Sequence, residues 1–401
     1  MIQPLRQAYN NAFSPEQYQA FLDKINQDYP NQLDFRVAET PVFVPRDLTG
    51  KLLSACDDII DVLTRDDFRA RSEGAIPDGQ RVPNERSDDH TQFLAVDFAI
   101  CQDDTTGELT PQLIELQGFP SLYGFQPYLA TQFRNHFPIP DSLSHLFNVA
   151  DNAAYVERLR QMIVGDCHPD EVILLEIYPE RQKTRIDFAL TEAYIGVSPV
   201  CLTRIQKKGR QLFYEKNGKT IPIRRIYNRL IFDDLQNFPD LKTAFQLTDD
   251  VDVEWVGHPN WFFRISKYTL PLLKSPYVPD SHFLSDLGEY PSDLENYVLK
   301  PLFSFAGSGV KLHITPADLD AIPSDQRAGY LIQRKVTYKP VIQAPDGLIK
   351  CEIRMLFIWP EHEPKPTLVT NLSRLSRGEM IGVRFNKDFD WVGGTVCFFE
   401  H

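Results

Sequence analysis

The chain has few cysteines, and their spacing excludes the common cysteine sites. Six of them are spread over 401 residues, and no two form a CxxC pair, so the sequence contains neither a zinc ribbon nor a thioredoxin-like motif. Several lie among apolar neighbours, as in VCLTRI and TVCFF, and we expect them to be small residues of a hydrophobic core.

Long apolar runs are also missing. No stretch approaches the roughly 20 apolar residues of a membrane-spanning helix, and the opening MIQPLRQAYNNAF lacks the basic and apolar segments of a signal peptide. The formal net charge is -13, and an acidic surface repels nucleic-acid phosphates and anionic lipids. We therefore expect a cytoplasmic protein that binds neither nucleic acid nor membrane. The sequence does not predict an oligomeric state.

Several motifs that identify an enzyme by themselves are absent. The sequence has no Walker A loop, no GxSxG elbow and no HExxH helix, and we find no internal repeat. What it does have is the ordinary balance of a globular protein, with 42% hydrophobic and 24% charged residues. Its length suits two or three domains rather than one compact core.

Three regions differ in their secondary-structure pattern. In residues 1–150, Ser14 caps one predicted helix, and a second covers 48–63 with Leu52 and Cys56 on one face. The region also contains a predicted hairpin whose strands, 93–100 and 112–116, are joined by the turn DDTTGE. Residues 151–255 begin with a helix that Asp151 caps and continue with the apolar strand EVILLEIYP, a helix and the strand SPVCLTRI, which is the βαβ pattern of a small parallel sheet. The hairpin RQLFYEKNGKTIPIRRIYN follows, with Asn217-Gly218 at its tip. Residues 256–401 are rich in strands, including KLHIT, and predict an antiparallel sheet. The predicted fold class is α+β with an α/β subdomain.

The stretch YVLKPLFSFAGSGVKLHIT has the composition of a phosphate-binding turn. A strand ends at Lys300, and the small residues Gly307, Ser308 and Gly309 follow. Small residues let backbone N–H groups approach phosphate oxygens, and a lysine adds its ammonium to the same oxygens. A plain hairpin with a glycine turn and a surface lysine explains the stretch equally well.

Two later strands carry polar residues that suit a nucleotide site. In GYLIQRKV, an apolar strand runs into Gln333, Arg334, Lys335 and Val336, whose backbone groups can read a base edge. For this segment alone we favour an edge strand with outward charges.

In KCEIRMLFIW, Glu352 and Arg354 are two residues apart and share a face of a strand, opposite the face that carries Cys351, Ile353 and Met355. They form either a plain cross-strand pair or a site for Mg²⁺ and a γ-phosphate, because Mg²⁺ prefers one or two carboxylates plus phosphate oxygens.

The order of these motifs resembles that of ATP-grasp enzymes. With FLAVDFAI and PQLIELQGFPSLYG upstream, the chain resembles the circularly permuted, glutathionylspermidine synthase-like family, in its synthetase part only. There, a strand with an Asp precedes a strand ending in Glu-x-Asn, and Asp97, Glu115 and Gln117 occupy these positions here. The resemblance covers most of residues 90–400 in short islands. It implies a nucleotide cleft between two α+β lobes, with ATP and Mg²⁺ as cofactors.

The resemblance also implies residue roles. It assigns Mg²⁺ to Asp97, Glu115, Gln117 and Glu352. The α- and β-phosphates go to Lys300 and to the lysine of SKYTLPLL, Lys267, under the loop of Gly307, Ser308 and Gly309. An acyl phosphate goes to the arginines Arg354, Arg374 of NLSRLSRG, and Arg229 of RRIYNRLIFDDL. The metal carboxylates then come from residues 1–150, a substrate domain from 151–255, and the nucleotide-binding lobes from 256–401.

Two departures from the family pattern bear on function. Gln117 replaces the family Asn, and Ala95 stands where the family often has an Arg. The resemblance implies an ADP-forming ligase that joins a small-molecule or peptide carboxylate to an amine or thiol through an acyl phosphate. Three alternatives stay open: a small-molecule kinase on the same fold, a non-catalytic ATP-binding sensor or scaffold, and an unrelated structural protein.

Overall fold

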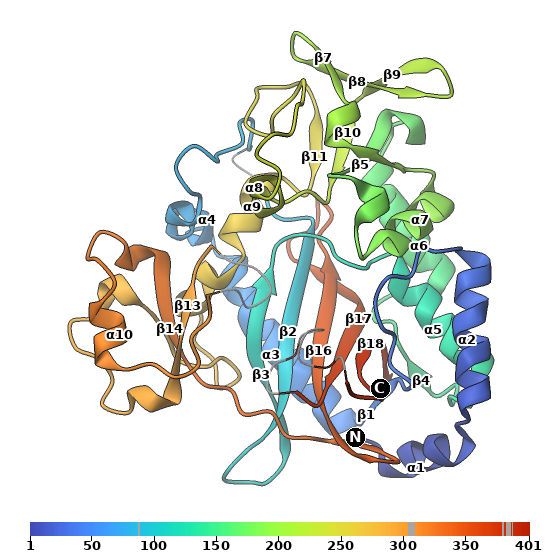
Figure 1. Cartoon of the computed structure of the whole chain (residues 1–401), viewed down its shortest axis with the longest axis vertical. Helices are drawn as coiled ribbons and strands as arrows, with labels where there is room; N and C mark the ends of the chain where they lie inside the picture. The colour runs from blue at the N-terminus through green and yellow to red at the C-terminus, as the bar shows by residue number, and fades with distance from the viewer. Residues whose placement is uncertain (87–88, 304–308, 379–380, 382–385, 387) are drawn as a thin grey trace.

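The computed structural model describes residues 1–86, 89–303, 309–378, 381, 386 and 388–401 (Figure 1). A six-stranded antiparallel sheet occupies the middle of the molecule, a smaller antiparallel sheet lies beside it, and a parallel sheet lies above it in this view. The α+β class predicted from the sequence is confirmed. Within the described residues, no helix combines the length and apolar character needed to cross a membrane.

The central sheet joins strands from both ends of the chain. Its order is β18-β17-β16-β2-β3, and β15 pairs with β16. The strands are β2 (Phe93–Gln102), β3 (Leu109–Gln117), β15 (Ile342–Ala344), β16 (Gly347–Ile358), β17 (Thr367–Ser376) and β18 (Gly393–Thr395). The predicted hairpin of β2 and β3 is therefore confirmed, and it pairs through β2 with the long strand β16.

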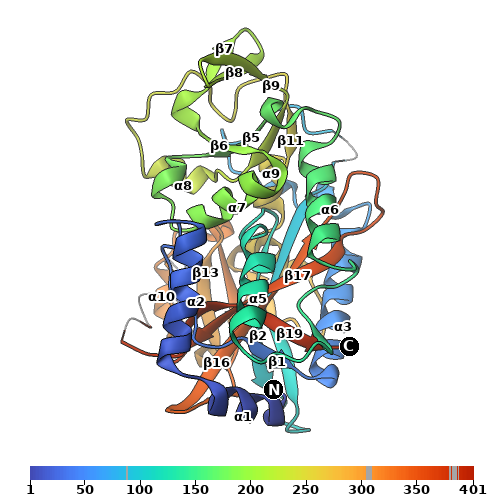
Figure 2. The same cartoon turned by 90° about the vertical axis from the view of Figure 1, so that its right-hand side faces the viewer.

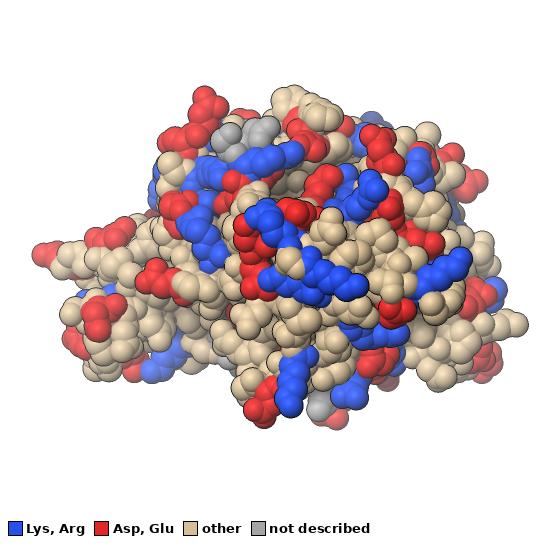
Figure 3. Space-filling model, turned by 90° about the horizontal axis from the view of Figure 1, so that it is seen from above, with Lys and Arg blue, Asp and Glu red and all other residues tan. Residues whose placement is uncertain are grey.

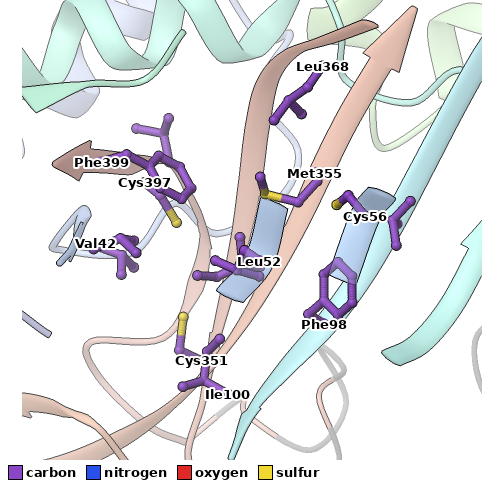
Figure 4. Packing of buried hydrophobic residues seen from close by; sticks show 14 of the residues in the cluster. Val42, Leu52, Cys56, Phe98, Ile100, Cys351, Met355, Leu368, Cys397 and Phe399 are labelled. Carbon is purple, nitrogen blue, oxygen red and sulfur yellow. The ribbon is translucent and has the colours of Figure 1, made fainter. Parts of the chain in front are cut away.

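The main hydrophobic core lies against one face of the central sheet. Helix α3 (Arg46–Leu63) covers it, and the apolar face predicted for this helix, including Leu52 and Cys56, is buried. Figure 4 shows Leu52 and Cys56 close to Phe98 and Met355 of the sheet. The alternation of β16 sends Met355 into this core and Arg354 to the opposite face, as the sequence predicts.

A β-bulge sets the faces of β3. Asp97 lies opposite Glu115, but Phe98 lies opposite Leu113, so one residue of β3 is left over between these pairs. The bulge lets Leu113 and Leu116 both point into the core although they are three residues apart. Glu115 and Gln117 are thereby held together on the other face.

Around the central sheet, helices from the first half of the chain form an outer layer. Figure 2 shows α2, α5 and α7 on the same side of the molecule, and α2 and α7 both contact α5. The helices of this layer are α1 (Gln3–Ala12), α2 (Pro15–Asp28), α5 (Phe125–His136), α6 (Asn152–Val164) and α7 (Arg185–Ile195). The short helix α4 (Phe68–Arg71) lies on the other side of the molecule (Figure 1). Ser14 and Asp151 cap α2 and α6 as predicted. A further sheet, β1-β19-β4, joins Val42–Val44, Cys397–Glu400 and Leu143–Ser144.

The predicted βαβ unit is confirmed in a four-stranded parallel sheet of order β11-β10-β5-β6. Its strands are β5 (Val172–Glu176), β6 (Ser198–Cys201), β10 (Arg225–Asn228) and β11 (Glu254–Val256), and helix α8 (Phe232–Gln236) follows β10. The sequence also predicts that the hairpin strand runs on through RRIYN. The structure ends it at Ile223 and begins β10 at Arg225, because β10 pairs in parallel with β5 instead.

A small sheet, β7-β8-β9, extends from this region and is made of Gln206–Lys208, Gln211–Lys216 and Lys219–Ile223. Asn217 and Gly218, both with positive φ, form the predicted turn. Two basic residues of this region pair with acidic ones: Lys207 with Asp249, and Arg210 with two further aspartates. Seen from above in Figure 3, blue and red side chains accordingly alternate.

The remaining sheet has the order β12-β14-β13 and forms a lobe with α10. The lobe consists of β12 (Ser281–Phe283), β13 (Tyr297–Pro301), α10 (Pro316–Asp320) and β14 (Tyr330–Arg334). The helix α9 (Pro259–Arg264) and the 3-10 helix η5 (Lys267–Leu272) precede it in the chain. The prediction of one antiparallel sheet for residues 256–401 is therefore wrong, because β16 and β17 pair with the early hairpin instead.

The predicted strand KLHIT is also absent. Only Lys311 bridges Leu299, and a capping box at Thr315 then starts α10.

Candidate active site

The polar face of the central sheet carries most of the predicted site residues. Asp97 lies opposite both Glu115 and Arg354 in the sheet register. Glu352 lies opposite Arg374, and Gln117 follows Glu115 on the same face. We call these six side chains the charged sheet face: Asp97, Glu115, Gln117, Glu352, Arg354 and Arg374. Residues from distant parts of the chain thus meet on four adjacent strands.

Asp97 is the centre of an ion-pair network. Arg354 donates from Nε to Asp97 Oδ1 at 2.5 Å and from Nη2 to Oδ2 at 2.6 Å. Arg374 Nη2 donates to the same Oδ2 at 2.6 Å. Asp97 is 1% exposed and Arg354 is 6% exposed, so this is a buried, bidentate pair. Both oxygens of Asp97 are engaged by guanidinium groups, which leaves Glu115, Gln117 and Glu352 as the oxygen donors on this face.

Glu352 is held between Arg374 and a tyrosine. Arg374 forms an ion pair with its Oε1, and the hydroxyl of Tyr338 donates to its Oε2 at 2.9 Å. Burial raises the pKa of Glu352, and Arg374 opposes that shift. A buried carboxyl with a raised pKa gains from a further cation. Sequence reasoning missed Tyr338, because a tyrosine 14 residues before a glutamate gives no spacing signal.

Gln117 carries an unsatisfied acceptor. Its Nε2 donates to Glu115 Oε2 at 3.1 Å, and its buried Oε1 has no hydrogen-bond partner among the residues that the structure describes. An amide oxygen beside a carboxylate suits a hard cation. Over the same residues, no group of three or more His, Cys, Asp or Glu side chains forms a metal cluster. The donor set thus resembles a Mg²⁺ site completed by phosphate oxygens rather than by protein alone.

Two lysines face these carboxylates. Burial lowers the pKa of Lys300 to about 8, and Glu115 and Glu352 oppose this shift. Burial also lowers the pKa of Lys267, with Glu115 and Asp233 opposing it. Glu115 therefore acts on both lysines, although they come from different elements, β13 and η5. Buried cations beside carboxylates are typical of a site that binds an anion and a metal together.

A cavity lies where these elements meet. It is lined by Glu115 and Gln117 of β3, by Lys267 of η5, and by Asp233 of α8. Phe303, which follows β13, also lines it and is 44% exposed. The sequence prediction named the first three of these residues but neither Asp233 nor Phe303.

The predicted phosphate loop is described only at its end. Gly307 and Ser308 lie outside the described residues. Gly309 has φ +71, and a Cβ there would meet Pro301 Cγ at 2.8 Å. A side chain at position 309 would therefore strain the backbone and clash with the strand end that carries Lys300.

The predicted base-reading strand is central, and the expectation of an edge strand is wrong: β14 lies between β12 and β13. The side chains of Arg334 and Lys335 are engaged locally. Arg334 pairs with Asp293 at 2.8 Å, and Lys335 donates to a backbone oxygen at 2.7 Å. Gln333 is 1% exposed, and Val336 follows the strand partly buried.

Arg229 lies outside the charged sheet face. It follows β10, is buried, and stacks over Phe119 and Phe188 at 5.8 and 5.4 Å. Within the described part of the chain, its Nε and Nη1 have no hydrogen-bond partner. Glu176 ends the neighbouring strand β5, and burial raises its pKa to about 8 against the effect of Arg229.

Glu176 and Arg229 lie where ligands usually bind in an open parallel sheet. The chain runs from β5 to β6 on one side and then to β10 and β11 on the other, so β5 and β10 flank the topological switch point. Glu176 and Arg229 stand at the carboxyl ends of these strands. Phe119 touches Arg229 and also lines the cavity beside Glu115, so the two polar regions adjoin.

The fold and the site together define an α+β protein with buried acidic and basic groups gathered where its sheets meet. Among solved structures, it is similar to the apo form of a glutathione synthetase-like effector, GSS30, from Globodera pallida. The two have 11% sequence identity and a TM-score of 0.58, and the match covers 96% of each chain. The chain thus has a glutathione synthetase-like fold. No protein-family model matches the sequence, and neither does any curated protein.

Proposed function

We propose that this chain is an ATP-dependent, ADP-forming ligase of the circularly permuted ATP-grasp type. The observation that carries the proposal is the gathering of Lys267 and Lys300 around Glu115, with Glu352 also acting on Lys300, from four different elements of the chain. A structural protein has no need of a buried lysine, Lys267, and a half-buried one, Lys300, whose pKa values are both lowered by burial. A site for Mg·ATP does, because the polyphosphate supplies the missing negative charge.

Each of these residues has a separate task in that proposal. Glu115, Gln117 and Glu352 would hold Mg²⁺, and the orphaned Oε1 of Gln117 supports this. Bound Mg²⁺ neutralises charge on transferring phosphoryl oxygens. Lys267 and Lys300 would bind α- and β-phosphate oxygens. Asp97 would act differently from the metal role predicted for it, by holding two arginines in place.

Arg354 and Arg374 would bind the carboxylate that is to be activated. Both are fixed by Asp97, and fixed guanidinium groups stabilise developing negative charge without reorganising. Arg354 also lies one strand away from Ala95, where the family often has an arginine. Its guanidinium could therefore perform the task of that missing side chain.

Arg229 and Glu176 would bind the second substrate. A buried arginine with unused donors suits a carboxylate, and a neighbouring carboxyl suits an amine. This supports a zwitterionic amine or thiol acceptor, or a peptide, at the switch point of the parallel sheet. Phe119 lies between that acceptor and the cavity.

Two measurements test the proposed function. Calorimetric titration of Mg·ATP should give saturable binding, and Glu115→Gln should weaken it. A screen of carboxylate and amine pairs should then show ADP release that requires both partners, with a condensed product. A phosphorylated acceptor would indicate a kinase, and binding without any acceptor-dependent ADP release would indicate a sensor. Absence of Mg·ATP binding would exclude all three.

Binding of Mg·ATP should depend on pH through Lys300. With its pKa at about 8, Lys300 is mostly charged at pH 7 and mostly neutral at pH 9. The apparent Kd for Mg·ATP should therefore rise about tenfold between these values. Lys300→Arg, whose charge does not titrate in this range, should make the affinity nearly constant. Calorimetry at a series of pH values measures both, and a flat wild-type profile would contradict the role of Lys300.

A further inference from the structure

The cavity of the candidate active site contains a carboxyl group that the proposed Mg²⁺ site leaves unused. Glu115 and Asp233 line this cavity from β3 and α8. The side chain of Asp233 is half-buried and forms no hydrogen bond or ion pair with any residue that the structure describes. Burial raises the pKa of Asp233, and Lys267 opposes that shift. A desolvated carboxylate without hydrogen bonds gains from a cation that enters the cavity.

Two further carboxyl groups continue from Asp233 toward Arg229. Burial raises the pKa of Asp234, Asp233 adds to this shift, and Arg229 opposes it. Asp234 in turn acts on Glu176, whose pKa burial raises to about 8. The cations that oppose the three shifts are Lys267 and Arg229. Carboxyl groups thus outnumber these cations on this side of the cavity, which favours a ligand with positive charge.

Aromatic rings form much of the remaining wall. Phe119, Phe262 and Phe303 line the cavity, and the rings of Phe119 and Phe262 meet edge to face with their centroids 5.5 Å apart. An alkylammonium gains from aromatic faces as well as from a carboxylate, whereas Mg²⁺ needs oxygen ligands, which the rings do not supply. Phe119 also contacts Arg229, whose Nε and Nη1 have no partner among the described residues and can bind a carboxylate. This side of the cavity therefore suits an organic ammonium that also carries a carboxylate.

The charges around the cavity distinguish between the nucleophiles that a ligase can use. A thiol attacks as the thiolate, and neighbouring carboxylates disfavour a second negative charge. An alcohol is neutral and gains nothing from them. An amine arrives as an ammonium, which the same carboxylates favour. The ammonium must lose a proton before its nitrogen attacks, and a positioned carboxylate can accept that proton.

We propose that Asp233 binds the acceptor as an alkylammonium and takes a proton from it, so that the second substrate is an amine rather than a thiol or an alcohol. This inference rests on the proposed function and names the nucleophile at the same site. Once the ammonium has given one proton to Asp233, the amine nitrogen attacks the carbonyl carbon of the acyl phosphate. The C–N bond forms, the C–O bond to the phosphate breaks, and the second proton lost by nitrogen leaves on the phosphate. Asp233 then returns its proton to water.

Three acceptors that differ only in the nucleophilic atom test this choice: β-alanine, 3-mercaptopropionate and 3-hydroxypropionate. Each keeps a carboxylate for Arg229. With Mg·ATP and a panel of carboxylates, β-alanine should release ADP at least roughly tenfold faster than the other two, although a thiol is intrinsically a strong nucleophile. Comparable or faster release with the mercapto or the hydroxy acid would overturn the inference and leave the proposed use of ATP standing. Release with none of the three would count against the proposed ligase itself and remove the inference with it.

A variant separates the proton acceptor from the rest of the site. Asp233→Asn keeps the shape of the side chain and removes the base, so kcat/KM for β-alanine should fall about 100-fold. Hydroxylamine is neutral at pH 7 and needs no such base, so the variant should still convert the acyl phosphate to a hydroxamate at nearly the wild-type rate. Asp240→Asn, at an exposed aspartate beyond α8, should change neither rate. Equal losses with both nucleophiles in Asp233→Asn would overturn the inference.

Discussion

Replacement of Lys300 by methionine is expected to weaken Mg·ATP binding about 100-fold and, at the same time, to stabilise the fold. The loss follows from removing a half-buried ammonium from phosphate oxygens, because hydrogen bonds to charged groups are worth about 1.5–3 kcal/mol each. The gain follows from the pKa of Lys300, which burial lowers from 10.5 to about 8. Charged groups that are held in place for a ligand are expected to destabilise the fold while the site is empty.

The sign of the stability effect follows from proton linkage. The unfolded chain keeps the proton of this lysine up to about its ordinary pKa, whereas the folded chain loses it near pH 8. The charged lysine therefore destabilises the folded state in full below pH 8. That cost shrinks between pH 8 and 10.5. Methionine removes the free-energy cost of the charged lysine, which is up to about 3 kcal/mol. It also destabilises the fold by about 1–2 kcal/mol, because Gln333 Oε1 loses the hydrogen bond that Lys300 donates.

Thermal unfolding at pH 7 and calorimetry measure the two effects. We expect a rise of roughly 2–4 °C in the melting temperature of Lys300→Met. Lys311→Met is the matched control, since Lys311 is about half exposed and pairs with Asp318 on the surface of the same lobe. Lys311→Met should change neither the melting temperature nor the affinity for Mg·ATP appreciably. Loss of binding together with a lower melting temperature would show that Lys300 supports the fold instead.

Local patterns in the sequence predicted the elements and one face of the site. Alternation on KCEIRMLFIW placed Glu352 and Arg354 on one face and Met355 on the other, as the register confirms. Capping residues and apolar spacing placed the start of α2, and both ends of α3 and α6, within two residues. The segment KLHIT failed, because alternation shows that a stretch can pair but not whether a partner strand is available.

Long-range pairing could not be read from spacing. Asp97 and Arg354 are 257 residues apart, and only the family resemblance connected their strands. The bulge next to Asp97 depends on how β3 fits the core, which no local pattern contains. The same holds for the hydrogen bonds of Tyr338 and Gln333. Their roles arise from neighbours supplied by other strands, and a single sequence without homologues carries no trace of them.

Breaking the pair of Asp97 and Arg354 is expected to have the largest effect on stability. Arg354→Met leaves the buried carboxyl groups of Asp97 and Glu352 to share one remaining guanidinium, that of Arg374, whose side chain is 37% exposed. Removing one partner of a buried ion pair typically costs about 3–5 kcal/mol, because the other charge stays desolvated and uncompensated. Asp97→Leu should cost a similar amount, since it leaves Arg354 without its bidentate partner.

The double variant Asp97→Leu/Arg354→Met decides whether the pair itself is responsible. With both charges gone, most of the loss should return, so that the double variant unfolds at a higher denaturant concentration than either single variant. Arg334→Met is the matched control, because Arg334 forms an exposed pair with Asp293 at 2.8 Å, and it should cost less than about 1 kcal/mol. Additive losses in the double variant would show that each side chain stabilises the sheet separately. Coupling would instead show that Asp97 and Arg354 stabilise the sheet as a pair, which is the support for the arginines that the proposed function requires.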